Sequence, residues 1–79
     1  MKLRQLGSNT TQITYDLHTG KMDILFSYET PVAALLPSGR YIRTEKKWSV
    51  TTSKHINKYL GGKDIGRTVA QSYIEDLVN

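Results

Sequence analysis

Residues 40–55 combine positive charge, hydroxyl groups and one indole ring in close succession. Cationic and hydroxyl side chains bind phosphate oxygens, and a flat aromatic face stacks on a nucleobase. The stretch therefore predicts a binding site for a ligand that carries both phosphate and a base. The tryptophan has two open interpretations, a ligand-stacking ring or an ordinary core residue. The candidate binding residues are Arg40, Arg43, Lys46, Lys47, Trp48, Ser49, Thr51, Thr52, Ser53, Lys54 and His55.

The second half of that stretch, residues 49–55, gives the more specific signal. Hydroxyl side chains precede a helical pattern, and such residues cap helix starts by accepting a hydrogen bond from a backbone N–H. With Thr52 or Ser53 as the cap, Lys54 and His55 fall in the first helical turn, where positive charge opposes the helix dipole. A bound anion would relieve that conflict. We expect an anion site here, with plain capping as the alternative.

Catalytic and metal-binding patterns are missing from the sequence. The serines near His55 match no nucleophile-elbow motif and no known order of a catalytic triad. The chain has no cysteine, and its two histidines, His18 and His55, lack metal-binding spacing. The sequence therefore predicts a protein that is not an enzyme and uses no metal or cofactor.

The positive charge of the chain is concentrated in one region. The net charge is +4, yet residues 40–58 hold six Lys or Arg against one acid, which is +5 and leaves −1 for the remainder. Such asymmetry indicates an anionic partner, either a nucleotide or a nucleic acid, with a merely solvated surface as the alternative.

Size and hydropathy limit the remaining classes of protein. A chain of 79 residues has a thin core, and without disulfides we expect it to form a homo-oligomer. No signal peptide is evident at the N-terminus. The longest apolar runs are about five residues, against the roughly 20 that a membrane span needs. We therefore expect a cytoplasmic protein with no membrane contact.

The elements that must position these residues are mostly strands. Residues 11–17 and 22–28 alternate apolar with polar side chains around a turn at residues 18–21, which predicts a β-hairpin. Residues 32–36 are apolar on both faces, which implies burial on both sides or a subunit contact.

Helical spacing dominates the last third of the chain. Apolar residues recur at three- and four-residue intervals over residues 52–60 and 68–78, so both segments are expected to be helices. Residues 1–79 then form a single α+β domain with mainly strands in residues 1–50. We expect an antiparallel meander of three to five strands, followed by two short C-terminal helices packed on one face.

Three segments resemble a family of small uncharacterised proteins from tailed-phage genomes. Their sequences are LGSN at residues 6–9, LFSYETPVA at residues 25–33 and RTEKKWSVTTSKHINK at residues 43–58. The match covers roughly residues 1–60, so the final helix lies outside it. The resemblance implies phage origin and action in the bacterial cytoplasm, and it assigns no functional residue.

These observations together predict a non-enzymatic binding protein for a phosphate-bearing, nucleotide-type ligand. In a phage setting, the sharper form is a counter-defence protein that sequesters a nucleotide immune signal. One alternative is a DNA- or RNA-binding accessory protein that uses the same residues. Another is a protein inhibitor of a host enzyme.

Overall fold

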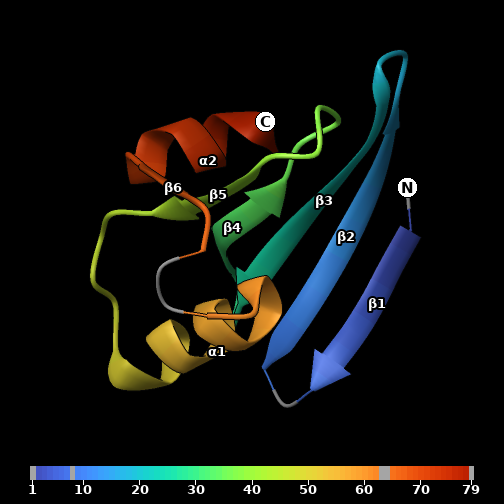
Figure 1. The fold of residues 1–79 in the computed structure, drawn as a ribbon. Helices are drawn as coiled ribbons and strands as arrows, with labels where there is room; N and C mark the ends of the chain where they lie inside the picture. Colours follow the sequence, from blue (N-terminus) through green and yellow to red (C-terminus); the bar gives the residue numbers. More distant parts are fainter. Residues whose placement is uncertain (1, 8, 63–64, 79) are drawn as a thin grey trace.

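The computed structural model describes residues 2–7, 9–62 and 65–78, and within them a six-stranded sheet carries two helices (Figure 1). Strands β1 to β5 form an antiparallel meander, and β6 pairs with β5 in parallel. The predicted α+β class is confirmed. The elements in chain order are β1 (Lys2–Gly7), β2 (Thr10–Leu17), β3 (Gly20–Ser27), β4 (Thr30–Leu35), β5 (Tyr41–Thr44), α1 (Val50–Leu60), β6 (Arg67–Val69) and α2 (Gln71–Leu77).

The predicted hairpin is β2 and β3. The two strands pair without a break from Thr10 opposite Ser27 to Leu17 opposite Gly20. Gly20 has a φ of 130°, which an L side chain rarely adopts, so the tight turn depends on a glycine there. The alternation in residues 11–17 and the glycine together explain why this hairpin was readable from the sequence.

Strand β6 is absent from the predicted elements, since at most five strands were expected and Thr68 was placed in the last helix. Instead, Thr68 lies in β6 opposite Arg43 of β5, and α2 begins only at Gln71. Parallel strands need a crossover connection, and α1 is part of that connection. A strand of three residues shows no alternation, so only its distant partner identifies it.

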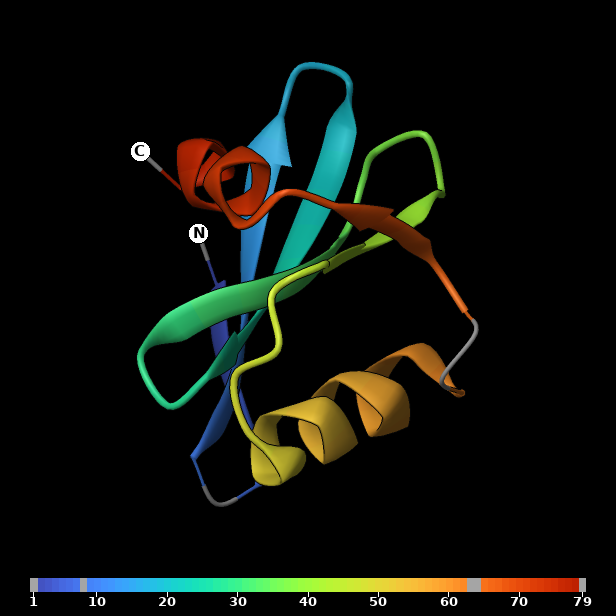
Figure 2. The same ribbon diagram turned by 90° about the vertical axis from the view of Figure 1, so that its left-hand side faces the viewer.

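The two helices pack on opposite faces of the sheet, so the expectation that they share one face was wrong (Figure 2). Alternate residues of the strands point to opposite faces and form two separate cores. The core on the α2 side consists of Met22, Ile24, Ala34, Ile42 and Ile74. The core on the α1 side consists of Leu25, Val32, Ala33, Ile56 and Leu60. The physical reason is β6, which receives the chain after α1 and passes it to the other face.

Strand β4 lies between the two helices and is buried on both faces. Val32, Ala33 and Ala34 have no exposed surface. Of the two explanations for its apolar sequence, burial within its own chain is correct. The chain's own helices cover the centre of this strand. No helix among the described residues is long and apolar enough to cross a membrane.

Candidate functional site

The residues predicted as one binding site are distributed over several places. Arg40 lines a hollow on the α2 side of the sheet together with Arg67. Thr51 and Lys54 are exposed on α1. The remaining predicted residues divide into a hollow on the α1 side lined by Arg43, Lys46, Lys47 and Ser53, a small hollow lined by Trp48, Ser49 and Thr52, and a groove lined by His55.

Helix α1 begins two residues earlier than predicted, which changes the argument for an anion at its start. Ser49 is the N-cap, and its Oγ accepts a hydrogen bond of 3.1 Å from the backbone N of Thr52. Capping by Thr52 or Ser53 was therefore wrong. Lys54 and His55 consequently lie in the second turn, beyond the range where the dipole acts strongly. The conflict between basic residues and the helix dipole is thus removed by the structure itself.

Arg43 is committed to contacts within the chain. Its Nη2 donates to Oδ1 of Asn57 at 2.7 Å, and its Nη1 donates to the carbonyl oxygens of Gly62 and Ile65 at 3.4 and 3.3 Å. The half-buried guanidinium therefore holds β5 against α1 and the loop that follows it. This role explains the arginine without a phosphate ligand.

Trp48 is not a core residue. Its side chain is 40% exposed and belongs to neither core cluster. Its Nε1 donates to Oε1 of Gln71 at 3.4 Å, and the ammonium of Lys46 lies 4.1 Å from the ring centroid. This cation–π contact covers one face of the indole, so a base could stack on that face only after Lys46 moved aside.

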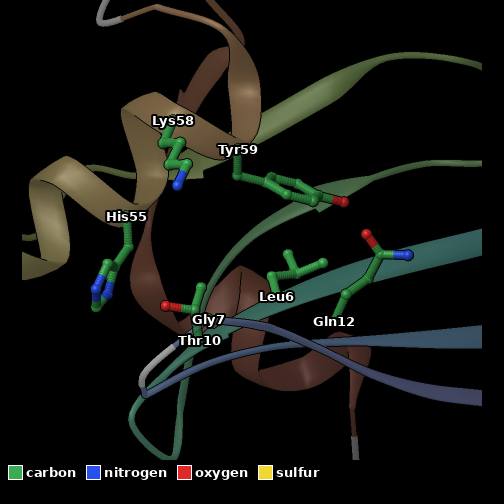
Figure 3. A pocket seen from close by; sticks show the side chains of 7 residues that line it. All are labelled: Leu6, Gly7, Thr10, Gln12, His55, Lys58 and Tyr59. Carbon is green, nitrogen blue, oxygen red and sulfur yellow. The ribbon is translucent and has the colours of Figure 1, made fainter.

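The groove that contains His55 lies between α1 and the β1–β2 hairpin, and we call it the α1–β2 groove (Figure 3). Its volume is about 570 Å³. The side chains from α1 stand opposite those from β1 and β2 (Figure 3). The lining residues are Leu6, Gly7, Thr10, Gln12, His55, Lys58 and Tyr59.

Lys58 and Tyr59 were not among the predicted site residues. Their spacing of three and four residues from His55 puts all three on one side of a helix, which is a signal that the sequence does contain. The signal was hidden because Tyr59 also fits the apolar stripe of α1. In the structure it does both, since it packs beside the α1-side core and lines the groove.

The groove offers three kinds of contact to a ligand. Lys58 supplies a positive charge, Gln12 supplies an amide, and Tyr59 forms an aromatic wall (Figure 3). Burial raises the pKa of the Tyr59 phenol well above its ordinary value, and the nearby Asp23 and Tyr41 add to the shift. The hydroxyl, which is a hydrogen-bond donor at neutral pH, therefore stays protonated further into the alkaline range than an ordinary tyrosine.

A hydrogen bond to a buried serine fixes the His55 ring. Its Nδ1 lies 2.9 Å from Oγ of Ser27, and that oxygen lies 3.1 Å from Oγ1 of Thr52. Ser27 is 2% exposed and Thr52 is 5% exposed. A Ser–His contact can signal a catalytic nucleophile, but here the serine is almost fully buried. Among the described residues, no three His, Asp or Glu side chains gather as metal ligands would.

Comparison with known proteins gives one match. No curated protein and no solved structure matches the chain. A family model matches residues 1–76, so the match extends past residue 60 and reaches into α2. The groove, the crossover and most of the final helix are therefore all within the matched region. The chain belongs to this family, DUF8033, a family of unknown function.

Proposed function

We propose that the protein binds a small, phosphate-bearing nucleotide-type ligand in the α1–β2 groove. The observation that carries the proposal is the placement of Lys58 and His55 beside the Tyr59 ring in one groove of about 570 Å³. That volume lies within the roughly 300–1,000 Å³ typical of small-molecule sites. Cationic and N–H donors suit phosphate, and the flat ring suits a base.

Each groove residue has a role in this proposal. Lys58 provides the charge for a phosphate oxygen, and His55 provides a second donor from the adjacent turn of α1. Tyr59 provides the surface for the base. Gln12 lies on the opposite strand and offers an amide to the edge of the base, since amides both donate and accept hydrogen bonds.

The resemblance to tailed-phage proteins suggests the biological setting. In that setting the protein is a counter-defence protein that sequesters a nucleotide immune signal in the bacterial cytoplasm. Sequestration needs tight binding and no chemistry. Self-association belongs to the proposal as well. Strand β1 ends the sheet order and is exposed along its whole length, so it offers an edge to a second copy.

The test is calorimetric titration of a panel of mono-, di- and cyclic nucleotides at fixed salt, with native mass spectrometry for oligomeric state and retained ligand. Lys58→Ala should weaken binding about tenfold or more, because a charge-assisted hydrogen bond is lost. Lys54→Ala is the matched control, since Lys54 is one turn away on α1 and does not line the groove. No nucleotide binding to the unmodified protein, or equal weakening by the two variants, would overturn the proposal.

Nucleic-acid binding is the second candidate, and the distribution of charge around β6 favours it. Arg40 and Arg67 line a hollow of about 690 Å³ on the α2 side, and Lys46 and Lys47 line one of about 390 Å³ on the α1 side. Thr68 of β6 lines both hollows, so positive charge flanks the strand on each face. An extended phosphate backbone could follow such a strip.

Salt dependence separates the two candidates. Binding through six or so phosphates should weaken about a thousandfold or more between about 50 and 200 mM salt. A small nucleotide held in the groove by a few directed hydrogen bonds should lose far less affinity. Arg67→Ala should reduce the salt dependence for a nucleic acid and leave nucleotide binding unchanged.

A further inference from the structure

A continuous chain of hydroxyl groups runs from the start of α1 to the imidazole of His55. Ser49 Oγ donates to Thr52 Oγ1 at 3.2 Å while it accepts from the Thr52 backbone N–H. Thr52 Oγ1 lies 3.1 Å from Ser27 Oγ, which lies 2.9 Å from Nδ1 of His55. The two central residues are buried, so the hydrogen bond between them is shielded from water.

One direction of this hydroxyl chain gives every buried hydroxyl hydrogen an acceptor. Each hydroxyl carries one hydrogen that it can donate. Ser49 donates its hydrogen to Thr52, and among the described contacts the buried Thr52 hydroxyl has Ser27 Oγ as the acceptor for its own hydrogen. In that arrangement Ser27 accepts from Thr52 and has its own hydrogen left for Nδ1 of His55. A nitrogen that accepts this hydrogen bond is unprotonated, so the neutral imidazole carries its hydrogen on Nε2.

We propose that Ser27 and Thr52 are positioning residues that hold His55 as the Nε2–H tautomer, so that the ring offers a donor to the α1–β2 groove. Among the described residues, Nε2 has no hydrogen-bond partner of its own. A donor at this point selects a ligand with an acceptor oxygen, such as phosphate or carboxylate, over a ligand that presents an N–H or O–H. This selectivity rests on the proposed function of the groove, whereas the tautomer does not.

The tautomer also restricts what His55 can do. A protonated Nε2 has no lone pair in the ring plane, so it cannot coordinate a metal ion. For the same reason it cannot act as a general base toward a ligand in the groove. His55 is therefore a fixed donor, and the hydroxyl chain is the device that fixes it.

The direct test is ¹⁵N NMR of the two histidine side chains without ligand, at a pH where both imidazoles are neutral. His55 should show a single tautomer with hydrogen on Nε2 and an accepted hydrogen bond at Nδ1. His18, exposed in the β2–β3 turn, is the internal reference and should show a mixture of tautomers. Ser27→Ala should move His55 toward the mixture seen for His18. Hydrogen on Nδ1 of His55 in the unmodified protein would overturn the proposal, whether or not the variant folds.

Binding of adenosine 5′-monophosphate tests the link to the ligand. Ser27→Ala should weaken this nucleotide about tenfold, as expected for loss of an oriented donor to phosphate. Ser53→Ala is the control, because Ser53 carries an exposed hydroxyl on α1 that is not part of the hydroxyl chain. The Nε2–H tautomer without any nucleotide binding would overturn the proposed function and support the proposed role of the hydroxyl chain. Nucleotide binding together with hydrogen on Nδ1 would overturn the proposed role of the hydroxyl chain and leave the proposed function standing.

Discussion

The guanidinium of Arg43 donates a hydrogen bond of 2.7 Å to the side-chain oxygen of Asn57 and so joins β5 to α1. The same side chain donates to the carbonyl oxygens of Gly62 and Ile65, where α1 has ended. One residue therefore holds both ends of the crossover that separates β5 from β6. The most basic stretch of the sequence thus contributes to the fold as well as to surface charge.

Arg43→Ala should lower the free energy of unfolding by about 1.5–3 kcal/mol, because hydrogen bonds from a charged group are lost. Arg43→Lys keeps the charge but not the planar fork, so it should recover only part of that stability. Urea unfolding followed by circular dichroism measures both. In a double-mutant cycle with Asn57→Ala, the coupling should be at least about 0.5 kcal/mol. An unchanged urea midpoint for Arg43→Ala would contradict the assigned role.

Ser49→Ala should destabilise the protein by about 1 kcal/mol, since the N-cap hydrogen bond of α1 is lost. Ser53→Ala, at one of the two cap positions that the sequence suggested, should change stability by no more than about 0.5 kcal/mol because its side chain is exposed. Thermal unfolding of the two variants in the same buffer compares them. A larger loss of stability for Ser53→Ala than for Ser49→Ala would instead place the N-cap of α1 at residues 52–53.

Tyr59 should make the protein less stable in alkaline solution. Burial raises the pKa of its phenol above its ordinary value, so the unfolded state ionises first. The stabilisation from the neutral phenol is complete below about pH 10, the ordinary tyrosine pKa, and is lost as pH rises from there through the raised, folded-state pKa.

The comparison of Tyr59→Phe with the unmodified protein isolates this effect, because phenylalanine keeps the ring and cannot ionise. Urea midpoints measured between about pH 9 and 11 should fall more steeply for the unmodified protein. In a spectroscopic titration of the five tyrosines, Tyr59→Phe should lose the phenol that ionises above the ordinary tyrosine range. Equal pH slopes for the two proteins would argue against the shift.

The fluorescence of Trp48 should report which surface a ligand occupies. It is the only tryptophan of the chain, and it lies beside Lys46 and does not line the α1–β2 groove. A nucleotide in the groove should leave its emission unchanged, whereas a nucleic acid on Lys46 and Lys47 should quench it. Quenching that saturates with a small nucleotide would move the ligand site to the indole.

The sequence was sufficient where neighbouring residues decide the structure. The β2–β3 hairpin follows from alternation over residues 11–17 and a turn that requires Gly20. The end of α1 follows from Gly61, which adopts the left-handed conformation with a φ of 91°. The apolar sequence of β4 correctly predicted burial on both faces. The sequence also identified His55 as a binding candidate, although it placed the residue in the wrong turn of the helix.

The sequence was insufficient where residues far apart must meet. The predicted basic site is divided because β5 and α1 turn its residues toward different faces. Lys58 becomes a groove residue only when α1 lies beside β1 and β2. Ser27 contacts His55, which lies 28 positions later in the sequence.

Local periodicity and turn chemistry therefore determined the class of this fold, its central β2–β3 hairpin and the charge that its surface carries. The tertiary structure alone decided the position of β6, the placement of the helices on opposite faces and the composition of the groove. The physical reason is that a three-residue parallel strand is stabilised by its partner and not by its own sequence. Once β6 pairs with β5, the crossover fixes α1 on one face and leaves α2 for the other.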